Sequence, residues 1–255
     1  MRAPAWLTLA LAVLWALVPG LFTGHDPLSG VPADKLLPPS AEHWFGTDAV
    51  GRDLFARVVH GAAQSLSGAA VAVAVGLVLG TLLGLAAGTA GGLLDGLVMR
   101  LMDVLLAVPG LLLALTVIVL LGPGTVNAAV AVGVGSVAAF ARLTRAEVVR
   151  VRGSDYVEAA YGSGGTVTAV LRRHVLPNSL GPVIALAALQ TGVAVLALST
   201  LGFLGYGAEP PTPEWGLLIA EGRDYLATSW WLTTLPGVVV VAVVLAAGRL
   251  SKELR

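Results

Sequence analysis

The chain has 255 residues, of which 56% are hydrophobic and only 12% are charged, and its formal net charge at pH 7 is zero. A soluble domain of this size carries about a quarter charged residues, so this composition and a mean hydropathy of +0.87 exclude an ordinary soluble protein. The absence of cysteine excludes disulfides and thiolate metal sites, while the zero net charge neither indicates nor excludes a nucleic-acid partner.

Five long stretches contain no Asp, Glu, Lys or Arg. They are residues 3–24, 61–94, 104–141, 175–208 and 225–248. A membrane-spanning helix needs about 20 apolar residues, so the third stretch is too long for one span, and the turn signal Leu121-Gly122-Pro123-Gly124 divides it. The short alternating segments of a membrane barrel are absent. We therefore expect an all-α integral membrane protein with six transmembrane helices.

The expected helices cover residues 4–22, 65–88, 100–121, 126–145, 180–205 and 233–250. Residues 1–64 would hold the first transmembrane helix and an extracytoplasmic segment, and residues 65–255 would form the core transmembrane domain. Residues 4–22 lack an Ala-x-Ala cleavage site before the polar segment, so we expect a retained helix rather than a signal peptide.

Basic residues predict the orientation of the chain in the membrane. If the N-terminus is cytoplasmic, eleven of the fifteen Lys and Arg residues lie inside, and only Lys35, Arg52, Arg57 and Arg223 lie outside. Cytoplasmic loops carry the excess of Lys and Arg, so both termini are expected on the cytoplasmic side.

Four glycines recur at spacings of four residues within the second expected helix: Gly76, Gly80, Gly84 and Gly88. Residues at this spacing fall along one helix face, where small side chains let another helix approach closely. This face predicts a helix bundle but says nothing about its activity.

The basic segment of residues 146–178 is polar enough to leave the membrane. Asp155 is a candidate N-cap, and Glu158 stands three residues later, in the capping-box position. We expect a helix over residues 156–163 that stops at Gly164-Gly165, then a second helix over residues 166–173 that stops before Pro177.

The spacing in this loop resembles a known motif. Glu158-Ala159-Ala160, Gly164 and then His174-Val175-Leu176-Pro177 resemble the EAA loop of ABC importer permeases, whose coupling helix docks on the ATPase subunit. The resemblance implies an ATPase-coupling role for the following residues: Asp155, Tyr156, Glu158, Ala159, Ala160, Gly164, Arg173, His174, Leu176 and Pro177.

Two further segments resemble the C-type permeases of the dipeptide, oligopeptide and nickel group. They are HWFGTDAVGRDLFARV at residues 43–58 and LGFLGYGAEPPTPEWG at residues 201–216. The extracytoplasmic motif residues so identified are Gly46, Thr47, Asp48, Gly51, Arg52, Asp53, Pro210, Pro211, Trp215 and Gly216. Asp48, Arg52 and Asp53 would close the outer mouth or contact a binding protein. Alternatively, they form a turn that leads into a helix capped by Asp53.

The resemblance implies a type I ABC importer permease with a MetI-like fold in the bacterial inner membrane. Its partners would be a B-type permease, two ABC ATPases and an extracytoplasmic substrate-binding protein, with no nucleic acid. No Gly-x-x-x-x-Gly-Lys-Ser/Thr loop is present, and the only lysines are Lys35 and Lys252. ATP and Mg²⁺ would therefore belong to the partner ATPases, and this chain would carry no cofactor or catalytic residue.

Four alternatives remain open at this stage. Di- or oligopeptides are the expected substrates, with nickel or a metal chelate as the runner-up. An intramembrane enzyme would need His174 within reach of Ser136, although the two are expected in different compartments. His25, His43 and His60 lack the spacing of helical metal-ligand pairs, so we interpret them as lone surface histidines. A membrane scaffold would explain the helices but not the loop motif.

Overall fold

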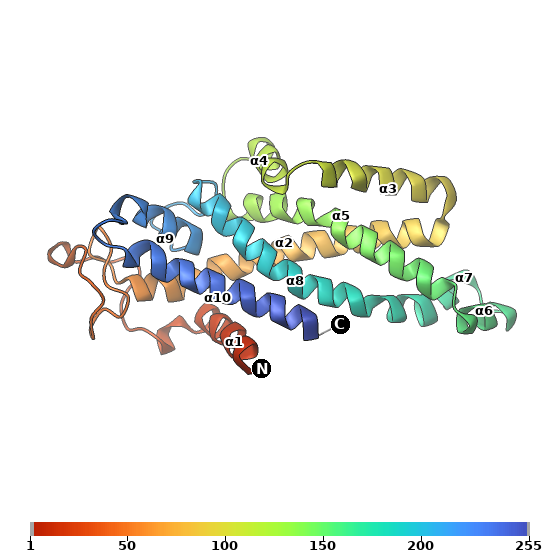
Figure 1. The fold of residues 1–255 in the computed structure, drawn as a ribbon, viewed down its shortest axis with the longest axis horizontal. Coiled ribbons are helices and arrows are strands. Elements are labelled where there is room, and N and C mark those ends of the chain that lie inside the picture. The colour runs from red at the N-terminus through yellow and green to blue at the C-terminus, as the bar shows by residue number, and fades with distance from the viewer. Residues whose placement is uncertain (1–2, 254–255) are drawn as a thin grey trace.

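A computed structural model describes residues 3–253, and these form an elongated bundle of helices (Figure 1). Within the described residues, extended pairing is limited to an isolated bridge between Thr47 and Asp53. The helices are α1 (Ala3–Leu17), α2 (Leu54–Ala90), α3 (Gly92–Ala107), α4 (Gly110–Leu121), α5 (Thr125–Arg152), α6 (Asp155–Gly162), α7 (Val167–Val170), α8 (Leu176–Phe203), α9 (Trp215–Gly222) and α10 (Trp231–Glu253). The expected all-α membrane fold is confirmed.

The expected count of six spans is not exact. Among residues 3–253, four helical segments are long and apolar enough to cross a bilayer: Leu54–Ala90, Thr125–Arg152, Val167–Phe203 and Trp231–Glu253. The shorter apolar helix at the N-terminus ends at Leu17, five residues before the expected end.

The expected third span, residues 100–121, is broken. It covers the second half of α3 and all of α4, whose axes differ by 97°. Between them Val108 is extended, because the proline that follows it, Pro109, disfavours helical geometry in the residue before it. Pro109 was the signal in the sequence for this bend.

Helix α2 begins at Leu54, eleven residues earlier than expected, because Asp53 caps it by accepting a hydrogen bond from the Ala56 N–H. The helix is therefore continuous across the expected boundary between residues 64 and 65. Its amino end lies at the end of the bundle that carries α9 and the loops before α2 (Figure 1).

The glycine face of α2 lies against α5, as expected for close helix packing. A Cβ atom added at Gly80 would lie 2.5 Å from the Phe140 Cβ and 2.6 Å from the Val137 carbonyl oxygen. Gly76 meets Ser136 and Gly84 meets Thr144 along the same contact. Within the described residues, this pair of helices makes the most extensive contact of the bundle.

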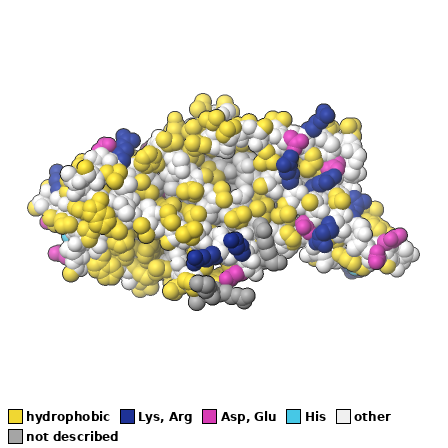
Figure 2. All heavy atoms as spheres, in the orientation of Figure 1, with side chains coloured by type: hydrophobic (Ala, Val, Ile, Leu, Met, Phe, Trp, Pro, Cys, Tyr) yellow, Lys and Arg dark blue, Asp and Glu magenta, His cyan; other side chains and the backbone are white. Residues whose placement is uncertain are grey.

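Large apolar side chains remain exposed along the flanks, among them Leu79, Leu82, Val119, Leu120 and Leu245. The face in Figure 2 is mostly hydrophobic along the bundle, while charged side chains gather on the end that carries α6. Apolar exposure of this kind suits a surface solvated by lipid. The two polar ends therefore hold the candidate functional groups.

Candidate functional site

One candidate site is the loop between α5 and α8, which places α6 at the far end of the bundle (Figure 1). The expected N-cap is wrong: Ser154 occupies that position, makes no side-chain cap bond, and donates its hydroxyl to the Val151 carbonyl. Asp155 and Glu158 instead lie within the first turn, where negative charge is favoured by the helix dipole.

Helix α6 is fixed to the bundle through Val157. This side chain is fully buried and packs with Val148 and Val151 of α5 and with Val170 and Val175 after α6. Tyr156, Glu158 and Ala159 remain exposed, and Ala160 is half-buried. The arrangement leaves one face of a short helix exposed, while one buried residue ties the helix to α5.

Gly164 ends this helix in a left-handed conformation, with φ at +85°. Its N–H donates to the Tyr161 carbonyl, and the Gly165 N–H donates to the Ala160 carbonyl over 3.1 Å. This is the type of closure that glycine favours at helix ends. The helix ends at Gly162, one residue before the expected end.

The expected stop before Pro177 is wrong. The chain continues from α7 through a π-helical turn, Leu171–Val175, directly into α8. Proline lacks an N–H and its ring meets the carbonyl four residues earlier, so the wider turn gives Pro177 room. Arg173 and Pro177 are exposed, Leu176 is half-buried, and the His174 ring lies 6.5 Å from that of Tyr156.

The opposite end of the molecule carries a charged cluster around Asp48. Its carboxylate accepts bonds from the backbone N–H groups of Val50 and Arg52, from Arg52 Nε at 2.6 Å and from an Arg57 guanidinium nitrogen at 2.7 Å. Burial by itself raises the pKa of Asp48, but the hydrogen bonds from Arg52 and Val50 outweigh it and lower that pKa. Asp48 is therefore held ionised.

Arg57 is completely buried and also donates to Glu221 of α9 over 2.7 Å. Arg52 lies 3.6 Å from the same carboxylate. These side chains line a cavity of about 270 Å³ at the polar end. The cluster joins the loop before α2 to α9, two segments far apart in the sequence.

The other motif residues before α2 shape the loop. Gly46 and Gly51 have φ values of +74° and +83°, a region that favours glycine. The Thr47 hydroxyl donates to the Asp34 carbonyl and accepts from the Leu37 N–H. Asp53 caps α2, as the second interpretation of this segment predicted.

The motif at residues 201–216 leads into α9, which Glu214 caps. Glu214 accepts from the N–H groups of Gly216 at 2.8 Å and Leu217 at 2.9 Å, and the Ser65 hydroxyl donates to it. The buried Trp215 indole N–H donates to the Val58 carbonyl. Pro210 and Pro211 remain exposed on the loop before it.

These features agree with the comparisons with known proteins. The profile of the family described as binding-protein-dependent transport system inner membrane component matches residues 80–253. The chain belongs to this family. The permease is also 40% identical over 243 residues to the probable D,D-dipeptide transport system permease protein DdpC of Escherichia coli (strain K12), covering 94% of this chain and 82% of that protein.

Two other relatives are similar. The dipeptide transport system permease protein DppC of Alkalihalophilus pseudofirmus is 40% identical, covering 95% of this permease and 80% of the relative. The glutathione transport system permease protein GsiD of Salmonella typhimurium is 42% identical, and the match covers 85% of this permease and 72% of the relative.

Solved structures support the fold. A chain of the inward-facing MetNI methionine ABC transporter matches with a TM-score of 0.62 at 19% identity, covering 79% of the permease and 98% of that chain. The MetI-like fold expected from the sequence is thereby confirmed.

Sequence reasoning missed three charged groups of the permease: the buried Arg57 and Glu214 and the half-buried Glu221. Two of them had a local signal. Arg57 interrupts an apolar turn, and Glu214 directly precedes Trp215-Gly216 at a helix start. Their shared role was not visible, because Arg57 and Glu221 are 164 residues apart.

The structure gives the enzyme alternative no support. The Ser136 hydroxyl donates to the Gly133 carbonyl over 2.8 Å, and within residues 3–253 no hydrogen bond joins it to His174. Ser136 also faces Gly76 across the contact between α2 and α5. It is a small packing residue of the permease.

Replacing Glu214 with alanine is expected to destabilise the permease by about 1–2 kcal/mol, the usual effect of losing a helix cap. The change leaves the N–H groups of Gly216 and Leu217 buried without their acceptor. Unfolding of the detergent-solubilised protein measures the effect. Glu209→Ala, an exposed carboxylate on the same loop, is the matched control and should change stability by less than about 0.5 kcal/mol. Equal effects of the two changes would contradict the capping role.

Proposed function

We propose that this permease is one of two membrane subunits of an ATP-driven importer for di- or oligopeptides. The names of its relatives support this substrate class: two are dipeptide permeases and one is a glutathione permease. The observation that carries the mechanism is the exposed helix α6, which is tied to α5 through Val157. A nickel or metal-chelate importer is the second candidate, because the outer motifs resemble that group as well.

The partners in this proposal are a B-type permease, two ABC ATPases that bind ATP and Mg²⁺, and an extracytoplasmic binding protein. The nucleotide and its Mg²⁺ are bound by those ATPases and not by the permease. Both termini face the cytoplasm, in agreement with the distribution of basic residues. Two of those residues, Arg2 and Arg255, lie outside the described part of the chain.

In the proposed mechanism, the ATPases bind the exposed residues of α6 and move it when they close on ATP. Val157 packs against the end of α5, and α5 packs along the glycine face of α2. A displacement of α6 is therefore transmitted to the centre of the bundle as the movement of a packed unit. ATP biases the permease between two arrangements through differential contacts with α6.

The residues that line a cavity of about 350 Å³ would form one wall of the proposed pathway. They belong to α2, α4, α5 and α8. Most are apolar or small, and Ser136, Gln190 and Thr200 add neutral polar groups. Such a lining can accept the amide groups of a peptide without binding one side chain strongly, and the second permease would complete it.

Uptake of a labelled dipeptide and of radioactive nickel, in cells with and without this gene, tests the substrate. Loss of peptide uptake alone supports the leading proposal. Loss of nickel uptake alone assigns the permease to the metal branch. Loss of neither rejects both substrates, and the ligand of the cognate binding protein would then be identified.

Two substitutions in the loop test coupling. Glu158→Ala is expected to lower uptake several-fold while membrane insertion stays normal, because Glu158 is exposed on α6 and its loss removes a contact rather than a core residue. Gly164→Ala should act similarly by straining the left-handed turn. Transport assays and membrane levels of the protein measure both.

The matched control is Glu253→Gln, an exposed carboxylate near the C-terminus, which should transport normally. Unchanged uptake in both Glu158→Ala and Gly164→Ala would exclude the proposed role of α6.

A further inference from the structure

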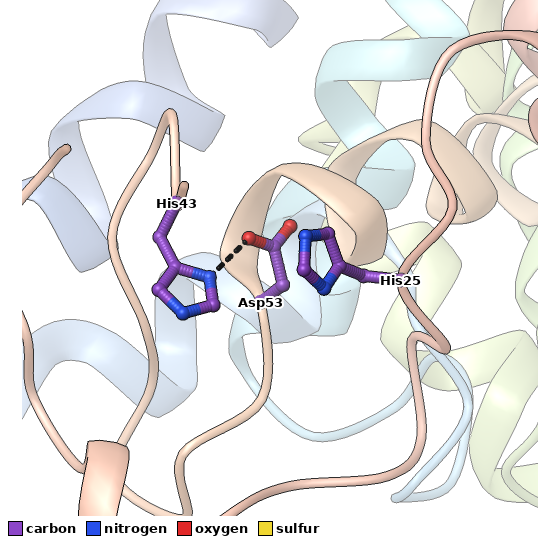
Figure 3. Close-up of side chains that lie close together, drawn as sticks. All are labelled: His25, His43 and Asp53. Atoms are coloured by element: carbon purple, nitrogen blue, oxygen red, sulfur yellow. Dashed lines mark hydrogen bonds and ion pairs between the residues drawn. The ribbon is translucent and has the colours of Figure 1, made fainter. Parts of the chain in front are cut away.

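Three side chains from separate segments meet beside the start of α2. His25 follows α1, His43 belongs to the outer loop, and Asp53 caps α2 (Figure 3). Each offers a ligand atom, and these atoms all lie within 4.8 Å of one another. The interpretation of His25 and His43 as lone surface histidines is therefore wrong, since their ring centres are 5.3 Å apart.

The cluster has a fixed side and an adjustable side. Asp53 is buried, and its Oδ1 accepts from the Ala56 N–H, which leaves Oδ2 directed at His43 Nδ1 at 2.8 Å. His43 is half-buried, whereas His25 is exposed. The two histidines thus lie beside the Asp53 carboxylate, which its role as the cap of α2 holds in place.

The cluster also borders an open space. His25 and Asp53 line a cavity of about 180 Å³, to which Glu42 adds a second carboxylate. A cavity of this size has room for an ion and for the water molecules that complete its coordination. A surface histidine whose ring nitrogens are already hydrogen-bonded needs no neighbouring cavity.

We propose that His25, His43 and Asp53 bind a divalent transition-metal ion of the Zn²⁺ type. Two imidazoles and one carboxylate are ligands that Zn²⁺ accepts, and three protein ligands plus water are typical of an open zinc site. Ligands at about 2.0 Å from a tetrahedral ion lie about 3.3 Å apart. His43 Nδ1 and Asp53 Oδ2 must then separate slightly from 2.8 Å, while the exposed His25 moves closer.

Binding replaces the hydrogen between His43 and Asp53. The ion takes the position of that hydrogen, and the His43 imidazole carries its one proton on Nε2 and stays neutral, so that Nδ1 and the Asp53 carboxylate become metal ligands. The bound ion would tie the segment after α1 to the start of α2. None of the three ligands lines the cavity between α2, α4, α5 and α8, so the site is a resident one and does not depend on the proposed function.

Zn²⁺ binding to the full-length permease, purified in detergent and stripped of metal, tests this site. Equilibrium dialysis followed by metal analysis should find one Zn²⁺ ion per chain. His25→Ala is the decisive variant, because an exposed side chain can be removed without disturbing the core. It should weaken binding at least about tenfold, and His43→Ala should do the same.

His60→Ala is the matched control. His60 hydrogen-bonds to the Ala56 carbonyl one turn earlier in α2 and is not one of the three clustered ligands, so this variant should bind Zn²⁺ like the unaltered chain. Absence of Zn²⁺ from the unaltered chain, or unchanged affinity in both His25→Ala and His43→Ala, would overturn the proposal. Dialysis against Ni²⁺ with the same dependence on His25 would also support it.

Discussion

Replacing Arg57 with leucine is expected to destabilise the permease by about 3–5 kcal/mol, the usual cost of breaking a buried ion pair from one side. The Arg57 side chain is 0% exposed, and those of Asp48 and Glu221 are 8% and 30% exposed. Leucine fills part of the volume but leaves Asp48 and Glu221 without this cation. Equilibrium unfolding in mixed detergent micelles measures the loss.

The loss comes from the carboxylates, which then share only the Arg52 cation, rather than from the guanidinium. Within the described chain, Arg57 Nε has no hydrogen-bond partner, so the arginine itself is imperfectly satisfied. The double variant Arg57→Leu with Asp48→Asn should therefore recover part of the stability, because the two residues are directly coupled.

An exposed pair serves as the control for Arg57. Arg223 and Asp224 lie 3.4 Å apart with side chains 60% and 78% exposed, and pairs of this kind contribute little. Arg223→Leu should change stability by less than about 1 kcal/mol. A loss as large as that of Arg57→Leu would show that general charge removal, and not the buried cluster, is responsible.

The second large effect is expected at the contact between α2 and α5. Gly80→Leu should destabilise the bundle by about 3 kcal/mol or more, the upper range for overpacking a well-packed interior. Even the first added carbon lies 2.5 Å from Phe140 Cβ and 2.6 Å from the Val137 carbonyl oxygen. The backbone of α5 must move to admit it, because a carbonyl cannot rotate away as a flexible side chain can.

Gly80→Ala separates this clash from helix propensity. Alanine is favoured over glycine within a helix by about 1 kcal/mol, but here the clash should make the change destabilising by about 1–3 kcal/mol. Gly96→Ala in α3 is the matched control, since a Cβ there meets nothing within 4 Å. It should be neutral or stabilising, and destabilisation of both variants to the same degree would contradict the packing argument.

Much of the helical architecture was predictable because its signal is local. An apolar stretch must satisfy its backbone groups internally within a bilayer, so charge-free segments indicate membrane helices. The spacing of Gly76, Gly80, Gly84 and Gly88 likewise placed small residues on one face. The same locality explains the errors: Ser154 rather than Asp155 occupies the N-cap position of α6, and a π-helical turn leads directly into α8, which contains Pro177.

The sequence by itself determined the membrane class, the helical fold, the glycine face and the loop motif of the permease. Each depends on residues close together in the chain, where hydropathy and helix periodicity act. Only the tertiary structure decided that Arg57 meets Glu221, that Val157 ties α6 to α5, and that His25 and His43 converge on Asp53. These contacts join segments that lie apart in the chain, and the number of residues between two segments does not say how close they are in space. Only the packing of the bundle brings them together.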